Sequence, residues 1–144
     1  MKPHHKDYIA YFVQLKAEHL SKIPELFAVD ARFKDPFNDV IGSQKIQNIF
    51  EHMFETTMNP QFVVRHAAQT ESTEEDVLLL VWDFSFKTKR GQAFEWQGSS
   101  KVMFDDNGLA IEHIDYWDPA ESIYESLPLI GSAARFLKSK MAST

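Results

Sequence analysis

The sequence predicts an α+β fold, in which a strongly curved antiparallel sheet packs on N-terminal helices and forms a cone-shaped barrel. Apolar residues recur at helical spacing before Asn59, whereas a period of two dominates from Phe62 to Asp118. Short polar or glycine-containing breaks separate the alternating segments, as hairpin connections require. Helices followed by a run of strands are typical of an α+β arrangement with the helices on one face of the sheet.

The first helix is predicted over Asp7–His19. Tyr8, Tyr11, Phe12 and Leu15 fall at i, i+3, i+4 and i+7, which is the apolar stripe of a helix packed on a core. Tyr11 therefore lies on the face that we expect to point inward.

A second short helix and a strand follow. Ser21 serves as its N-cap, and Pro24 is tolerated in the first turn because the N–H groups there have no helical partner. The strand Ala31–Pro36 places Phe33 and Asp35 on one face, since side chains alternate between the two faces of a strand. The aspartate is thus on the apolar side.

The third helix begins at Gly42-Ser43 and ends before Asn59-Pro60. Its stripe is the most regular in the chain and consists of Ile46, Ile49, Phe50, Met53 and Phe54. Four strands are then predicted, at Phe62–Gln69, Val77–Lys89, Phe94–Phe104 and Ala110–Asp118.

A helical tail is predicted at about residues 119–141. Asp118 is its N-cap, Pro119 its first residue and Glu121 the third, which together complete a capping box. We expect breaks at Leu127-Pro128 and near Gly131. The whole chain of 144 residues has the size of one domain with this tail attached.

Composition excludes several classes of function. A net charge of −6 argues against binding of a nucleic-acid backbone, which needs a basic stripe. The chain has no cysteine, so disulfides and thiolate chemistry are excluded. We expect no cofactor and no metal, because His4, His5 and His52 do not share ligand spacing with a carboxylate. No membrane-spanning run or signal peptide is evident, and a cytoplasmic location is predicted.

Strand alternation predicts which side chains line the cone. The inward sets contain Trp82 and Phe84 in one strand and Trp96 and Ser100 in the next. In the last strand His113, Asp115 and Trp117 share a face, and we place this face inward because it leaves Glu112 and Asp118 in water. The substrate-binding residues predicted from these faces are Phe33, Trp82, Phe84, Trp96, Ser100 and Trp117.

The polar residues among these aromatic side chains suggest acid/base chemistry. A buried carboxylate either finds hydrogen-bond donors or shifts its pKa toward neutrality, which suits proton transfer. Asp35, Tyr11, His113 and Asp115 form the predicted catalytic set for enolisation, cyclisation or water activation. Each also has a structural interpretation: Asp35 as a strand-end turn, Tyr11 as core, and His113 with Asp115 as a buried pair.

The chain resembles the nuclear transport factor 2-like superfamily, which includes ketosteroid isomerase and the SnoaL-like polyketide cyclases. The resemblance spans about Tyr8 to Trp117 and is clearest in three segments. These are Y-x₃-L-x₄-L-x₂-I-x₂-LF from Tyr11, D-A-x-F-x-D-P from Asp30, and G-x₃-I-x₃-F from Gly42. The expected fold is the cone-shaped α+β fold of that superfamily, and a homodimer is expected as well.

The resemblance also implies roles for residues. Asp35 matches the proton-shuttling base of the isomerases and Tyr11 one oxyanion donor, whereas Ser100 falls where they carry a protonated aspartate. Epoxide-hydrolase relatives carry an Arg and an Asp on this strand, and Gly98-Ser99-Ser100 supplies neither. Epoxide hydrolysis is therefore not expected. The SnoaL-like cyclases use an aspartate on a late strand, with a histidine nearby, as the acid/base residue. His113 and Asp115 are compatible with this pattern.

The expected function is binding of an apolar carbonyl-containing small molecule, with isomerisation or cyclisation through an enolate if the protein is an enzyme. The alternative is a non-catalytic carrier or a protein-interaction module, because this fold hosts many roles. The tail, which is apolar with three basic residues, could touch a membrane or cover the pocket.

Overall fold

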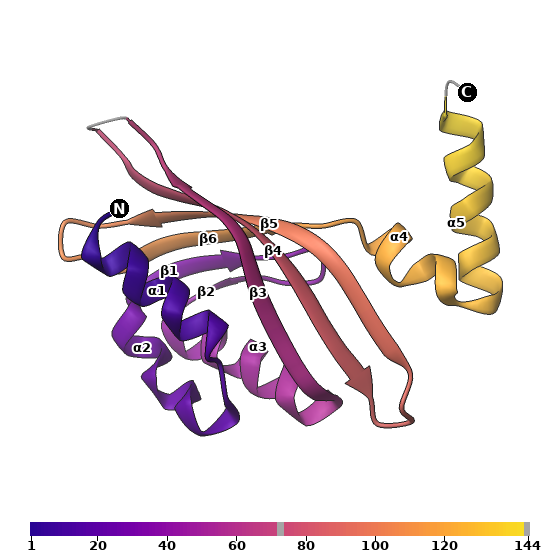
Figure 1. Cartoon of the computed structure of the whole chain (residues 1–144), viewed down its shortest axis with the longest axis horizontal. Helices are drawn as coiled ribbons and strands as arrows, with labels where there is room; N and C mark the ends of the chain where they lie inside the picture. Colours follow the sequence, from indigo (N-terminus) through magenta and orange to yellow (C-terminus); the bar gives the residue numbers. More distant parts are fainter. Residues whose placement is uncertain (72–73, 143–144) are drawn as a thin grey trace.

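The computed structural model describes residues 1–71 and 74–142 and confirms the α+β class (Figure 1). Its N-terminal elements are α1 (Pro3–Val13), η1 (Ala17–Lys22), α2 (Ile23–Leu26), β1 (Phe27–Lys34), β2 (Asp39–Ile41) and α3 (Ser43–Thr56). The strands β3 (Thr57–Gln69), β4 (Asp76–Thr88), β5 (Ala93–Phe104) and β6 (Ala110–Tyr116) follow. The chain continues with α4 (Pro119–Ser122), η2 (Tyr124–Ser126) and α5 (Pro128–Met141).

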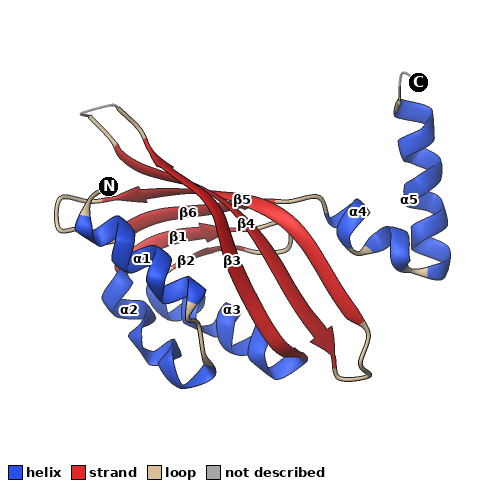
Figure 2. Cartoon of the chain, in the orientation of Figure 1, coloured by secondary structure: helices blue, strands red, loops and turns tan. Residues whose placement is uncertain are grey.

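The six strands form one open, curved sheet in the order β2-β1-β6-β5-β4-β3. The pairs from β3 to β6 are antiparallel, as the hairpin breaks predict, whereas β1 pairs with β6 in parallel. The helices α1, α2 and α3 lie together on one side of this sheet (Figure 2). Side chains from that side of the sheet and from the helices therefore meet in the core.

The first two helices differ from the prediction in their bounds. α1 begins at Pro3 and ends at Val13, and the separate 3-10 helix η1 covers Ala17–Lys22. This break lets Leu20 turn into the core, where it is buried. The apolar stripe of α1 is otherwise as predicted, because Tyr8 and Phe12 are buried.

The boundary between α3 and β3 also lies earlier than predicted. The helix ends at Thr56, and the strand runs through Asn59-Pro60. Proline is tolerated there because β3 is an edge strand, and the register with β4 shifts between Met58 and Gln61. Asn59 has a positive φ of 52° at this irregularity.

The predicted inward faces of the strands are confirmed. Leu78, Leu80, Trp82 and Phe84 of β4 are buried, as are Gly98, Ser100, Val102 and Phe104 of β5. In β6, His113 is buried whereas Tyr116 is 56% exposed. The His113 face is therefore the inner face of β6, as predicted.

The tail forms a separate helical arm. α5 runs through Gly131 without the predicted break. The glycine instead lets the helix lie against the backbone of η2. A Cβ at Gly131 would lie 2.5 Å from the carbonyl oxygen of Glu125. Arg135 also donates to this carbonyl, and Lys138 Nζ lies 3.6 Å from the Glu125 carboxylate.

α5 projects away from the sheet (Figure 1). Its apolar side chains are exposed, with Leu129 at 86% and Leu137 at 62%. No helix within residues 1–71 and 74–142 is long and apolar enough to cross a membrane. Contact of the tail with a membrane surface or with the pocket stays a prediction, as does the homodimer.

Candidate functional site

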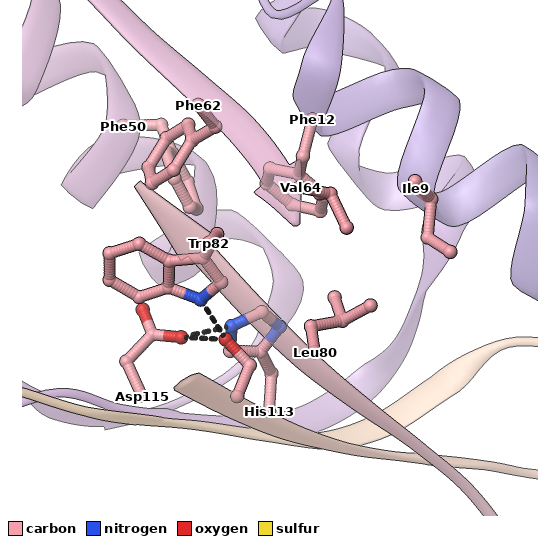
Figure 3. A pocket seen from close by; sticks show the side chains of 10 residues that line it. Ile9, Phe12, Phe50, Phe62, Val64, Leu80, Trp82, His113 and Asp115 are labelled. Carbon is pink, nitrogen blue, oxygen red and sulfur yellow. Dashed lines mark hydrogen bonds and ion pairs between the residues drawn. The ribbon is translucent and has the colours of Figure 1, made fainter. Parts of the chain in front are cut away.

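A chain of hydrogen bonds crosses the inner face of the sheet, and Figure 3 shows the part of it around Trp82, His113 and Asp115. Tyr8 Oη lies 2.6 Å from His113 Nδ1, and His113 Nε2 lies 2.6 Å from Asp115 Oδ1. Ser100 Oγ donates to the same Asp115 oxygen over 2.5 Å, and Trp82 Nε1 donates to Ser100 Oγ over 2.8 Å. One helix and three strands thus contribute to a single polar chain among aromatic side chains.

Strand pairing positions these groups. His113 and Asp115 are two residues apart on β6 and so share the inner face. Ser100 of β5 is directly opposite Asp115, and Gly98 of β5 is opposite Trp82. A Cβ at Gly98 would lie 2.3 Å from the Trp82 ring, so only glycine lets the indole lie across β5 and reach Ser100.

The protonation of this chain follows from burial. Burial, and secondly the negative charge of Asp115, raise the pKa of Tyr8 well above its ordinary value, so the phenol keeps its proton. Tyr8 therefore donates to His113 Nδ1, and the histidine carries its proton on Nε2 and donates to Asp115. The ring of Phe33 stacks on His113 with 4.9 Å between centroids and fixes its plane.

Asp115 lies between two cavities. The inner cavity has a volume of about 30 Å³ and is bordered by Ser100, His113 and Asp115 among apolar side chains. The outer cavity has about 270 Å³ and is bordered by Phe33, Trp82, Phe84, Trp96 and Trp117, all of which were predicted to bind substrate. Both hydrogen bonds to Asp115 end on Oδ1, and within the described residues no donor binds Oδ2.

The rim of the outer cavity is aromatic. Trp96 and Trp117 stack with 4.6 Å between ring centroids and an interplanar angle of 25°. Phe37 meets Trp117 edge-on at 5.4 Å and lies 6.3 Å from the ring of Tyr124 in η2. The arm thus begins at the rim of this cavity, whereas α5 points away from it.

Asp35 borders the outer cavity, but its carboxylate is occupied by the turn after β1. Oδ1 accepts the backbone N–H groups of Phe37 and Asn38 over 2.8 and 2.7 Å. The Asn38 side-chain amide donates to both oxygens of Asp35 over 3.1 Å. These contacts match the strand-end turn that was the structural interpretation of Asp35.

Tyr11 lies apart from the polar chain. Its hydroxyl donates to the carbonyl oxygen of His19 over 2.8 Å, and burial raises its pKa to about 12. It borders neither cavity. The tyrosine that the structure brings to His113 is Tyr8, one helical turn earlier, which the helical pattern predicts only as a core residue.

Replacing Tyr8 with phenylalanine is expected to lower the free energy of unfolding by about 1–3 kcal/mol, because it leaves His113 Nδ1 buried without a donor. It should also shift the nitrogen-15 NMR signal of His113 Nδ1, which loses its hydrogen bond, while the Nε2–H that donates to Asp115 is kept. Tyr11→Phe is the matched control, since it loses one hydrogen bond worth about 0.5–1.5 kcal/mol. Equal stability of the two variants with an unchanged His113 spectrum would contradict this role for Tyr8.

Comparison with known proteins gives a family match and a fold match. The sequence profile of the SnoaL-like domain matches residues 8–113. No functionally curated protein matches the chain in sequence.

Several solved structures share the fold. An NTF2-like protein of unknown function from Burkholderia pseudomallei has a TM-score of 0.72 at 13% identity, over 85% of this chain and 96% of that one. A candidate SnoaL-like polyketide cyclase from Jannaschia sp. CCS1 has a TM-score of 0.72 at 13% identity, over 89% and 98%. A Mycobacterium tuberculosis protein in complex with estradiol-17β-hemisuccinate has a TM-score of 0.69 at 13% identity, over 82% and 95%.

Proposed function

Because the chain belongs to the SnoaL-like domain family, we propose that it binds a small apolar molecule bearing a carbonyl group, and that Asp115 moves a proton next to that carbonyl. The observation that carries this proposal is the position of Asp115. Its Oδ1 is held by His113 and Ser100, while its Oδ2 receives no hydrogen bond from the described residues at the border of an aromatic cavity.

The lining of the outer cavity supports an apolar ligand. Its volume of about 270 Å³ is close to the lower end of small-molecule pockets, which is roughly 300 Å³. The aromatic side chains of Phe33, Trp82 and Trp96 give the cavity an apolar lining that suits a ring system. The steroid ester bound by the mycobacterial structure belongs to that protein, but a ligand of similar chemical character suits this lining.

The hydrogen-bond chain supports proton transfer. Asp115 Oδ2 takes the proton from the carbon next to the carbonyl, the C–H electron pair becomes the C=C bond, and the carbonyl π pair moves to oxygen. In a substrate with a C=C bond next to that carbon, Asp115 returns the proton to the far carbon of the C=C bond while the oxygen pair re-forms the C=O bond. The C=C bond thereby moves next to the carbonyl, so atoms and electrons balance and no oxidant is needed. In a saturated ketone the proton returns to the same carbon, and exchange in D₂O reports the transfer. His113 and Ser100 hold the carboxylate in place and stabilise its charge before the transfer.

The alternative is a carrier that binds the same ligand without turnover. The apolar lining supports it equally, because binding needs the cavity and not the carboxylate. Proton exchange separates the two functions.

The experiment combines binding and exchange on a panel of cyclic and aromatic ketones. Trp82, Trp96 and Trp117 border the cavity, so bound ligands should quench tryptophan fluorescence. Proton NMR in D₂O then measures exchange of the hydrogens next to the carbonyl. Binding with accelerated exchange supports the proposal, binding without exchange supports the carrier, and no binding across the panel contradicts both.

A further inference from the structure

Two histidines and an aspartate converge at a second place, where the start of α1 meets the start of β4. His4 Nε2 lies 2.7 Å from Asp76 Oδ2, and His5 Nε2 lies 2.7 Å from Asp76 Oδ1. His5 is completely buried, while the His4 and Asp76 side chains are 28% and 17% exposed. The proposed reaction uses none of these residues, and none of them borders either cavity.

We propose that His4, His5 and Asp76 bind a divalent transition metal of the zinc class. The three ligand atoms all lie within 4.8 Å of one another. Two imidazoles and one carboxylate form a ligand set that zinc accepts, with a fourth position left for water. This site differs from the expectation of no metal, which rested on ligand spacing along the chain. Asp76 is 71 residues from His5, and only the fold brings them together.

The geometry needs small adjustments. Metal–ligand distances of about 2.0–2.2 Å place nitrogen and oxygen roughly 3.3 Å apart in a tetrahedral site, so the present 2.7 Å contacts must widen slightly. The partly exposed side chains of His4 and Asp76 leave room for this movement. Their exposure also gives the metal access from solvent.

The hydrogen-bonding state of His5 permits coordination. In the structure its Nε2 faces Asp76, and Nδ1 has no partner within the described residues. Coordination through Nε2 moves the ring proton to Nδ1. Because Nδ1 has no partner to lose, this change of tautomer breaks no hydrogen bond there.

The ammonium group of Lys2 competes with a metal ion for Asp76. Its Nζ lies 3.2 Å from Asp76 Oδ1, and its side chain is 51% exposed. An exposed ion pair of this kind contributes little stability, so an incoming metal ion displaces the ammonium readily. Removing Lys2 should therefore strengthen metal binding slightly, because it removes a weak competitor for Asp76.

Metal binding here would stabilise the position of α1. The helix carries Tyr8 one turn after His4, and Tyr8 bonds His113 in the candidate active site. A metal that binds the folded chain in preference to the unfolded chain raises the melting temperature. The expected role is therefore structural, and it holds whether or not Asp115 is catalytic.

The test is calorimetric titration of the metal-free full chain with Zn²⁺, together with Co²⁺ absorption spectra and melting curves. We expect one equivalent to bind, with a raised melting temperature and the visible absorption bands of coordinated cobalt. His4→Ala and Asp76→Asn should each weaken binding by at least about tenfold. Lys2→Ala should tighten it.

The matched control is His52→Ala, which removes an exposed histidine from α3 and should leave metal binding unchanged. His4→Ala is the main variant because His4 is partly exposed, so the variant should fold, whereas replacing the buried His5 endangers folding. The proposal is overturned if the wild type shows no saturable binding, or if His4→Ala and Asp76→Asn bind as tightly as the wild type does.

Discussion

Asp115→Asn is expected to lower the rate of proton exchange on a bound ketone by about two to four orders of magnitude, the usual contribution of a positioned general base. The amide has nearly the shape of the carboxylate but does not accept the proton. Ligand binding measured by tryptophan quenching should change little, since the aromatic lining is untouched. Proton NMR in D₂O measures the exchange rate of both proteins.

Asp35→Asn is the matched control for this experiment. Its carboxylate already accepts hydrogen bonds from Phe37 and Asn38, so we expect a change of only a few-fold in the exchange rate. Near-wild-type rates for both variants would reject proton transfer by either aspartate. A large loss in Asp35→Asn alone would assign the base to Asp35 instead.

Phe33→Ala is expected to have the largest effect on stability, a loss of about 3–5 kcal/mol in the free energy of unfolding. The side chain is 2% exposed, stacks on His113, and meets Phe50 edge-on with 5.5 Å between centroids. Its removal leaves a cavity beneath the hydrogen-bond chain and frees the imidazole to tilt. Urea unfolding monitored by circular dichroism measures the loss.

Phe37→Ala serves as the comparison, because Phe37 follows the same strand but is 54% exposed. We expect it to cost less than about 1 kcal/mol, as most surface substitutions do. If the two alanine variants unfold at the same urea concentration, the packing role assigned to Phe33 is incorrect.

Much of the fold is predictable from local pattern. Strand alternation identified the inner faces of β4, β5 and β6, because a one-residue shift would expose apolar side chains such as Leu78 and Val102. It also placed His113 and Asp115 on one face. The aromatic residues predicted to bind substrate all border the outer cavity for the same reason.

The features that local pattern does not predict depend on contacts between segments that are distant in the sequence. Tyr8 and Tyr11 lie on one apolar stripe, and only packing against β6 decides that Tyr8 meets His113. The parallel pairing of β1 with β6 and the cluster around Asp76 also join segments far apart in the chain. No spacing rule within a single element reports such contacts.

The irregular path of β3 has a consequence for assembly. β3 is the longer of the two edge strands, and a long regular edge is a template for pairing with another chain, which leads to aggregation. Pro60 offers no N–H, and the register with β4 shifts again between Val64 and His66. The sheet therefore stays open without a regular free edge, which disfavours its extension by a strand of a neighbouring molecule.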